Sequence, residues 1–312
     1  MRNSIPDLDA GQLVLVALSG GPDSLALAAA TAFEAQRSGL RAGAVVVDHG
    51  LQDGSAEVAA TASAGATALG LDPSVVKSVV VDRSGGPEAA ARTARYAALE
   101  QARHEHGAAC ILLGHTLDDQ AESVLLGLAR GSGAGSLSGM DAVSGTLRRP
   151  LLGIRRSTTA QFCADAGLEP WHDPHNIDAR FTRVRVRQRV LPVLETELGP
   201  GIAEALARTA DLVREDAEAL DHFAGEIIEE LADHAEAGIS LPVAALAANP
   251  AALRQRLIRL AVEAEFHVSL SRHHTLEVAR LVTDWNGQKP LNLPGISVER
   301  RGTLIVFSAR DN

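Results

Sequence analysis

The segment Ser19-Gly20-Gly21-Pro22-Asp23-Ser24 decides how the N-terminal half of the chain folds. It follows an apolar run, Leu13 to Leu18, and precedes a helix-like run, Leu25 to Ala35. A strand that turns through two glycines into a helix presents backbone N–H groups at the positive end of the helix dipole, where phosphate groups bind. The segment therefore predicts a nucleotide-binding loop between a strand and a helix.

Two other phosphate-binding loops do not fit this segment. A Walker A loop has the pattern G-x-x-x-x-G-K followed by Ser or Thr, and the dinucleotide loop has G-x-G-x-x-G. Neither pattern is present, and no lysine lies nearby to reach a terminal phosphate. Taken alone, the six residues leave one alternative open, a Gly-Pro turn before an ordinary helix.

The chain up to about Arg130 alternates strand-like and helix-like segments, as in an α/β protein. The strand-like runs are short and apolar, which is typical of strands buried on both faces, and the segments between them are alanine-rich and long enough for crossover helices. We therefore predict a doubly wound parallel sheet. The predicted strands are Leu13 to Leu18, Gly43 to Asp48, Val75 to Val81 and Cys110 to Gly114, and the predicted helices are Ser24 to Gln36, Ser55 to Ala68, Pro87 to His106 and Leu117 to Ala129.

Ligands of such sheets bind beyond the carboxyl ends of the strands, and two further motifs fall there. Asp48 and His49 follow the second strand, where they would either meet an adenine or ribose edge or simply end the strand. The segment from Gly114 to Glu122 follows the fourth strand. Three motifs at one rim favour a shared site.

The segment after the fourth strand is dense in acids. Asp118, Asp119 and Glu122 fall in or next to the first turn of a helix, where the dipole favours acids in any case. Asp119 and Glu122 share one helical face, which suits a magnesium ion or the ammonium group of a ligand.

Arginines are concentrated in two places. Arg92 and Arg95 share a face of the third helix, so that one directed at the rim would stabilise charge on a reacting phosphorus, and otherwise the pair is a solvated stripe. The tract from Arg180 to Arg189, which follows Trp171-His172-Asp173-Pro174-His175-Asn176, would grip phosphates and stack a base. The alternative for the tract is a surface element that balances the acidic segment after it.

Composition and charge set wider limits. The chain has 312 residues, is 46% hydrophobic and 22% charged, and contains no uncharged apolar run of about 18 residues, which predicts a cytoplasmic protein without a membrane partner. Its net charge is −10, but residues 195–235 alone hold twelve acids and two arginines. A basic surface elsewhere thus remains open. Cys110 and Cys163 are expected to be reduced and buried.

The rest of the chain is predicted to form a helical linker and a small α+β domain. A glycine- and serine-rich loop, Gly131 to Gly139, follows the sheet, and Gly201 to Ala232 reads as a long acidic helix. Two more helices, Pro250 to Glu265 and Arg272 to Asp284, precede a β hairpin within Lys289 to Phe307. We expect a catalytic domain at 1–195, the linker at 196–240 and a substrate-binding domain at 241–312, with a mildly basic face at Arg254, Arg256 and Arg259.

These motifs together resemble the tRNA(Ile)-lysidine synthase family of PP-loop ATP pyrophosphatases. The resemblance rests on SGGPDS (19–24), VDHGL (47–51), the helix from Glu88 to Tyr96, GHTLDDQAES (114–123), RPLL (149–152) and DPHNIDARFTRVRVR (173–187). It implies a reaction in which ATP adenylates the C2 carbonyl oxygen of the wobble cytidine in an isoleucine tRNA with a CAU anticodon. The amine of L-lysine then displaces AMP to give lysidine.

The resemblance and the position of each residue at the rim together assign the site. ATP and Mg²⁺ are the implied co-substrate and cofactor, tRNA(Ile) and L-lysine are the implied partners, and the sequence leaves a homodimer open. The assignment is ATP binding by Ser19, Gly20, Gly21, Pro22, Asp23, Ser24, Asp48, His49, Gly114 and His115; catalysis by Asp23, Arg95 and Asp119; lysine binding by Asp119 and Glu122; Mg²⁺ binding by Asp23 and Asp118; and tRNA binding by Arg149, Arg180, Arg183 and Arg187.

Three other functions compete with this one. A PP-loop tRNA thiolase acting on cytidine would need paired cysteines, and Cys110 and Cys163 are isolated. An amide-forming relative such as NAD or GMP synthetase would need an ammonia source, and no glutaminase nucleophile is visible. A non-enzymatic ATP-binding module explains the glycine loop but leaves the acid-rich rim without a use.

Overall fold

The computed structural model describes residues 5, 7–50, 54–79, 87–131, 133–231, 233–235 and 238–310. The chain divides into two compact units, 1–213 and 214–312, which are described separately. Their boundary falls within a long helix, α9 (Ile202–Leu231), which confirms the helix predicted for the acidic segment. In the described residues, no helix combines the length and the apolar character that crossing a bilayer requires.

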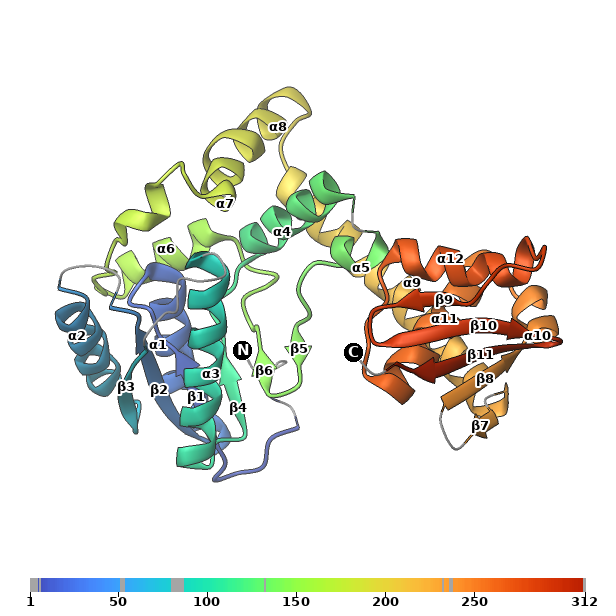
Figure 1. The fold of residues 1–312 in the computed structure, drawn as a ribbon. Helices are drawn as coiled ribbons and strands as arrows, with labels where there is room; N and C mark the ends of the chain where they lie inside the picture. The colour runs from blue at the N-terminus through green and yellow to red at the C-terminus, as the bar shows by residue number, and fades with distance from the viewer. Residues whose placement is uncertain are drawn as a thin grey trace. The chain divides into compact units, whose positions relative to one another are not determined.

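A six-stranded sheet forms the centre of the first unit, and Figure 1 shows its strands side by side among the helices. The strand order is β3-β2-β1-β4-β6-β5, in which the neighbours from β3 to β6 are parallel and only β5 is antiparallel. The prediction of a doubly wound parallel sheet is confirmed. The strands are β1 (Leu13–Ala17), β2 (Arg41–Asp48), β3 (Ser74–Ser78), β4 (Cys110–Leu112), β5 (Val143–Ser144) and β6 (Leu147–Arg148).

Helices cover both faces of this sheet because successive strand residues point to opposite sides. Val14 and Val16 pack with α1 (Pro22–Ser38) and α2 (Ser55–Ala68), whereas Leu13 and Leu15 pack with α3 (Pro87–His106). All five residues of β1 are buried, as expected for the central strand. The predicted strand Val75 to Val81 begins one residue earlier than expected, and its last two residues lie outside the described part.

The rest of the first unit, which follows strand β4 in the chain, is mainly helical. The segment Gly131 to Gly139, predicted as a loop, contains a short helix, α5 (Ala134–Leu137). The arginine tract is helical and includes one π-helical segment, η3 (Val186–Val190). The remaining elements are α4 (Leu117–Arg130), α6 (Arg156–Asp165), η2 (Pro174–Ile177), α7 (Thr182–Arg185) and α8 (Leu191–Glu197).

The second unit is a small α+β fold. Its sheet has the order β7-β8-β11-β10-β9 with antiparallel neighbours throughout, so the predicted hairpin, β10 with β11, is one part of a larger sheet. The buried core brings Leu257 and Val278 of two helices onto Phe307 of the sheet. The elements are β7 (Asp233–Ala235), β8 (Gly238–Pro242), α10 (Val243–Ala248), α11 (Ala251–Phe266), α12 (Arg272–Thr283), β9 (Leu291–Leu293), β10 (Ile296–Arg301) and β11 (Leu304–Ala309).

Candidate active site

The glycine loop joins β1 to α1 at the carboxyl end of the sheet. Gly20 has a φ of +80°, which side-chain-bearing residues rarely adopt, and its carbonyl accepts a hydrogen bond from the Trp171 N–H at 2.9 Å. Ser24 closes the loop: its hydroxyl accepts from the Ser19 N–H at 3.1 Å and donates to the Gly21 carbonyl at 3.0 Å. The loop is thereby fixed at the N-terminus of a 17-residue helix, as an anion site requires.

Gly114 brings the fourth strand's end against this loop. A Cβ atom at Gly114 would lie 3.1 Å from the backbone N and Cα atoms of Ser24, and 3.2 Å from the carbonyl carbon of Asp23. Only glycine permits so close an approach without moving the loop. The predicted juxtaposition of the motifs that follow the first and fourth strands is therefore present, and Gly114 contributes through the space it leaves.

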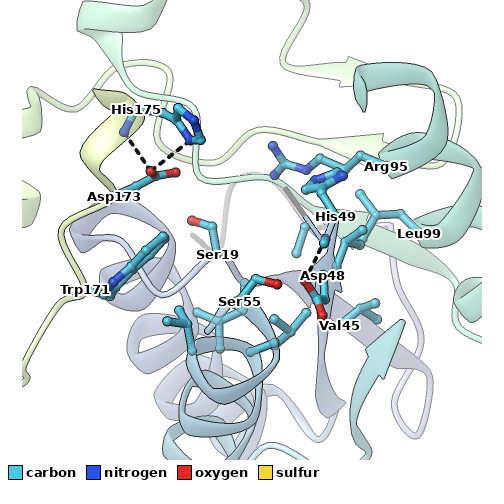
Figure 2. Close-up of a pocket in the computed structure, with 17 residues that line it drawn as sticks. Ser19, Val45, Asp48, His49, Ser55, Arg95, Leu99, Trp171, Asp173 and His175 are labelled. Atoms are coloured by element: carbon cyan, nitrogen blue, oxygen red, sulfur yellow. Dashed lines mark hydrogen bonds and ion pairs between the residues drawn. The ribbon is translucent and has the colours of Figure 1, made fainter. Parts of the chain in front are cut away.

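A pocket of about 230 Å³ opens beside the glycine loop at the ends of β1 and β2. Figure 2 shows Trp171 on one side of this pocket, Arg95 and His49 on the other, and Ser19 between them. Val45, Val46, Val47 and Leu99 supply an apolar floor, which suits a flat base. The Asp48 carboxylate accepts from the Gly50 N–H at 2.9 Å.

Trp171, Asp173 and His175 line this pocket, although the sequence suggested that they accompany the arginine tract. Asp173 accepts from the His175 N–H at 2.8 Å and lies 3.3 Å from its Nδ1, which fixes the turn that carries them. Trp171, the aromatic residue expected to stack a base beside the arginine tract, thus forms a wall of the pocket instead. The spacing of these residues in the sequence holds no signal for this, because the contact depends on the turn returning to Gly20.

Arg95 and Arg92, which share a helical face, have different surroundings. Arg95 lines the pocket, whereas Arg92 is exposed and lies over the Tyr96 ring, with its guanidinium carbon 4.9 Å from the ring centroid. Burial, and then the positive charge of Arg95, lower the pKa of His49. Nδ1 of His49 is buried without a hydrogen-bond partner among the described residues, so it is an available group for a ligand.

The acid-rich rim forms a capped helix start with two carboxylates turned inward. Thr116 is the N-cap of α4, and its N–H and hydroxyl each donate to Asp119 Oδ2 at 2.8 Å in a capping box. Asp119 is 8% exposed and Glu122 is fully buried. Burial raises the pKa of Asp119, but the Arg156 charge and the Thr116 hydrogen bonds outweigh it, so the pKa lies below its ordinary value.

Arg156, which sequence analysis did not single out, lies at the centre of these acids. Its guanidinium is 2.7 Å from Asp119 Oδ1, 3.3 Å from Glu122 Oε1 and 3.4 Å from Asp23 Oδ2. The sequence offered only a pair of adjacent arginines after RPLL, with no spacing rule that would separate Arg156 from Arg155. Thr159 lies one helical turn after Arg156 in α6, and its hydroxyl donates to Asp23.

The arginines predicted to bind tRNA fall into three settings. Arg187 donates to Glu122 at 2.7 and 3.1 Å, and Arg183 lies 3.9 Å from the same carboxylate, so both face the acid cluster. Arg149 is buried and donates to the Asp141 carbonyl at 2.6 Å, so it has a partner within the fold, and its assignment to tRNA binding stays a prediction. Arg180 has the exposed setting expected of a phosphate contact, with 84% of its side chain accessible, and it pairs with Asp178 at 2.6 Å.

The predicted basic face of the second unit is largely engaged within that unit. Arg254 donates to the carbonyls of Leu246 and Asn249, and Arg256 pairs with Asp221 at 2.6 Å. These contacts hold secondary-structure elements together, so the two arginines serve the fold in addition to any contact with a ligand.

The two predicted magnesium ligands differ in how well they suit that ion. Among the described residues, no three His, Cys, Asp or Glu side chains are grouped as a metal site. Mg²⁺ bound with ATP needs only one or two carboxylates, because phosphates and water supply the other ligands. Asp23, within the glycine loop, fits this requirement. Asp118 fits less well, because it lies outside the glycine loop, at the start of α4, and its oxygens accept from the Arg156 N–H at 2.7 Å and face Arg155 at 3.2 Å.

His115 is held in its neutral form beside this cluster. Burial lowers the pKa of His115 to about 4, and the nearby charges of Arg95, Arg149 and Arg183 act in the same direction, against the opposing effect of Asp119. Its Nδ1 is buried without a hydrogen-bond partner in the described ranges. At neutral pH the ring therefore adds no charge to the site.

Comparison with known proteins places the chain in a family. Residues 2–194 match the model of a PP-loop domain, and residues 241–304 match that of a TilS substrate binding domain. The chain is 64% identical to a tRNA(Ile)-lysidine synthase of Leifsonia xyli subsp. xyli over 298 residues, which covers 95% of this chain and 90% of that protein. The chain belongs to the tRNA(Ile)-lysidine synthase family. This confirms the resemblance that the sequence motifs indicated.

Other members of the tRNA(Ile)-lysidine synthase family align over nearly the whole chain. The protein of Thermobifida fusca is 54% identical, with 98% of this chain and 95% of that protein covered. The protein of Mycobacterium tuberculosis is 48% identical, with 97% and 90% covered. A solved U34-tRNA thiolase from Methanococcus maripaludis has a similar fold, with a TM-score of 0.56, 19% identity, and 68% of this chain and 77% of that chain covered.

Proposed function

We propose that the protein is a tRNA(Ile)-lysidine synthase, a ligase that forms a carbon–nitrogen bond in the cytoplasm. It would adenylate the C2 carbonyl oxygen of the wobble cytidine in a tRNA(Ile) with a CAU anticodon and then join L-lysine to the C2 carbon. The observation that carries this proposal is that Arg156 joins Asp23 of the glycine loop to the buried pair Asp119 and Glu122, in a chain 64% identical to a protein of that name.

The nucleotide would lie across the pocket and the glycine loop. Its base fits between Trp171 and the apolar floor of β2, where His49 offers an unpaired Nδ1, and its phosphates reach the N–H groups of Ser19 to Ser24. Arg95, whose guanidinium lines the pocket, would stabilise negative charge that develops on the α-phosphate.

The chemistry then takes place in two displacements. The C2 carbonyl oxygen of the cytidine attacks the α-phosphorus, an oxygen–phosphorus bond forms, and the bond to the pyrophosphate breaks. The lysine amine next attacks C2, loses a proton, and releases AMP with the oxygen that was adenylated. Activation is needed because an amide-like carbonyl oxygen is a poor leaving group until it carries a phosphate.

The protein's charged side chains divide between the two displacements. Asp23 would hold Mg²⁺, which when bound supplies positive charge to the leaving pyrophosphate. Asp119 and Glu122 would bind an ammonium group of lysine, since they are buried acids that already hold the cationic groups of arginines. Arg180 would contact the tRNA backbone from its exposed position.

The chain's segments would share the work along the divisions expected from the sequence. We propose that residues 1–195 carry out catalysis, that 196–240 link the two parts, and that 241–312 bind tRNA. The match of residues 241–304 to a substrate binding domain supports the last assignment.

Incorporation of labelled L-lysine into tRNA tests this function. The full chain, with ATP and Mg²⁺, should attach about one lysine to each isoleucine tRNA that has the CAU anticodon. The matched control is the same tRNA with uridine at the wobble position, which should remain unlabelled. Equal labelling of both tRNAs, or labelling of neither, would overturn the proposal. A thiolase would instead transfer sulfur, a role for which the buried Cys110 and Cys163 are poorly placed.

A further inference from the structure

Arg156 connects two groups of residues that belong to different steps of the proposed reaction. Its Nε atom faces Asp23 of the glycine loop at 3.4 Å, while its terminal nitrogens contact Asp119 at 2.7 Å and Glu122 at 3.3 Å. Its own backbone N–H donates to Asp118 at 2.7 Å, which anchors the start of α6. The guanidinium can therefore shift toward one group or the other while its backbone stays fixed.

The charges around Glu122 are already balanced. This carboxylate is fully buried and faces Arg156, Arg187 at 2.7 and 3.1 Å, and Arg183 at 3.9 Å. In the described residues, three guanidinium groups thus face Asp23, Asp119 and Glu122. A further cation gains little attraction from carboxylates that are compensated, and it must still lose its own hydration.

A triphosphate in the glycine loop would change this balance. The phosphates would lie beside Asp23, on the side to which the Nε edge of Arg156 is directed. Arginine presents a planar fork of donors that matches phosphate oxygens, and two of its three carboxylate contacts are long, at 3.3 and 3.4 Å. Phosphate is therefore a competitive partner for this side chain.

We propose that Arg156 couples the two substrate sites. The triphosphate in the glycine loop draws the guanidinium away from Asp119 and Glu122. These carboxylates then keep only Arg187 and Arg183 of the three guanidinium groups, and they bind the ammonium group of the amine substrate in place of Arg156. This inference rests on the proposed function, in which those two acids hold lysine. Because such coupling is reciprocal, the amine substrate tightens nucleotide binding by the same factor.

The experiment measures the dissociation constant of L-lysine by calorimetry, with and without Mg²⁺ and α,β-methylene-ATP, which cannot be cleaved between its α and β phosphates. The nucleotide should tighten lysine binding to the wild-type protein by roughly tenfold, within the usual range of coupling. In Arg156→Gln, lysine should bind equally well with and without the nucleotide, because no guanidinium has to leave.

Arg155→Gln is the matched control, since Arg155 is the adjacent residue and its removal changes the charge equally. Arg155 pairs with Asp118 at 3.2 Å and Glu204 at 2.8 Å, away from Asp119 and Glu122, so this variant should keep the nucleotide effect. Should Arg156→Gln fail to fold in a thermal unfolding assay, Arg156→Lys retains the charge without the planar fork and should show a reduced effect.

Two results would overturn the coupling: equal lysine affinity with and without the nucleotide in the wild-type protein, or an unchanged nucleotide effect in both Arg156 variants. Failure of the proposed function would give a different experimental result. If the double substitution Asp119→Asn and Glu122→Gln leaves lysine affinity unchanged, or if the wild-type protein binds no lysine, the lysine site itself is wrong.

Discussion

At the scale of single residues, the site depends on side chains whose charge is set by burial. His115 is kept neutral in a region where Asp23, Asp119 and Glu122 are balanced by arginines. A protonated ring would add a positive charge near Arg95, Arg149 and Arg183, and the attraction of Asp119 offsets this only in part. The neutral form also leaves a nitrogen lone pair available to a ligand.

This burial predicts a pH dependence of stability. The pKa of His115 is about 4 in the folded protein and 6.5 ordinarily, so the unfolded chain binds the proton more readily between these values. The contribution of neutral His115 to the free energy of unfolding is therefore complete above pH 6.5. It is lost as the pH drops toward 4, which lowers the free energy of unfolding by about 3 kcal/mol. Urea unfolding at several pH values would measure this fall.

The variant His115→Gln separates the contribution of His115 to this pH dependence from the contributions of other groups. The pKa of His49 is lowered in the same direction, and it contributes to the fall in both proteins. The difference in free energy of unfolding between wild type and His115→Gln should thus shrink as the pH falls from 7.5 to 4.5. Two parallel curves would show that the ring is protonated alike in both states.

At the scale of elements, the site is built by the close approach of strand ends. Gly114→Ala should push the start of α1, because the new Cβ would lie 3.1 Å from two backbone atoms of Ser24. Such overpacking typically costs 1–3 kcal/mol, so we expect the KM for ATP to rise roughly tenfold. Steady-state kinetics with varied ATP would measure it.

Gly153→Ala is the control for this change. Gly153 is exposed, and a Cβ atom there would meet nothing within 4 Å. The KM for ATP of this variant should match that of the wild-type protein. A Gly114→Ala protein with an unchanged KM would mean that the loop tolerates the displacement, and that the fourth strand's end does not set its position.

The arginine tract makes a second prediction at this scale. Arg180→Ala should weaken tRNA binding and reduce the slope of log K against log salt by about 0.7 to 0.9, as expected for one lost phosphate contact. Arg41→Ala is the control, because Arg41 is exposed at the first residue of β2, the opposite end of that strand from the site. Binding of tRNA measured at several salt concentrations checks both variants. A slope for Arg180→Ala equal to that of the wild-type protein would mean that Arg180 makes no phosphate contact and only pairs with Asp178.

The elements also show what sequence can predict. Strand ends and helix starts near Ser19, Asp48 and Gly114 follow from apolar periodicity and glycine positions, because these are local properties of the chain. Arg156 and Trp171 were missed or misplaced, since their contacts join segments far apart in sequence. The short strands β7 and β8 were missed because runs of three and five residues hold too little periodic pattern.

At the scale of the whole molecule, the account divides the work between a nucleotide-binding unit and a smaller α+β unit. The glycine loop belongs to the first, which has the general PP-loop fold shared with a thiolase at 19% identity. Specificity for the lysine and the tRNA is proposed to come from the residues around α4, α6 and the arginine tract, and from residues 241–312. The central claim is that ATP is cleaved only to activate the tRNA.

Release of pyrophosphate from ATP tests that claim most directly. With the full chain, sustained release should require both L-lysine and isoleucine tRNA bearing the CAU anticodon, and it should stop after at most about one turnover when lysine is withheld. Sustained release in the absence of tRNA would contradict the account.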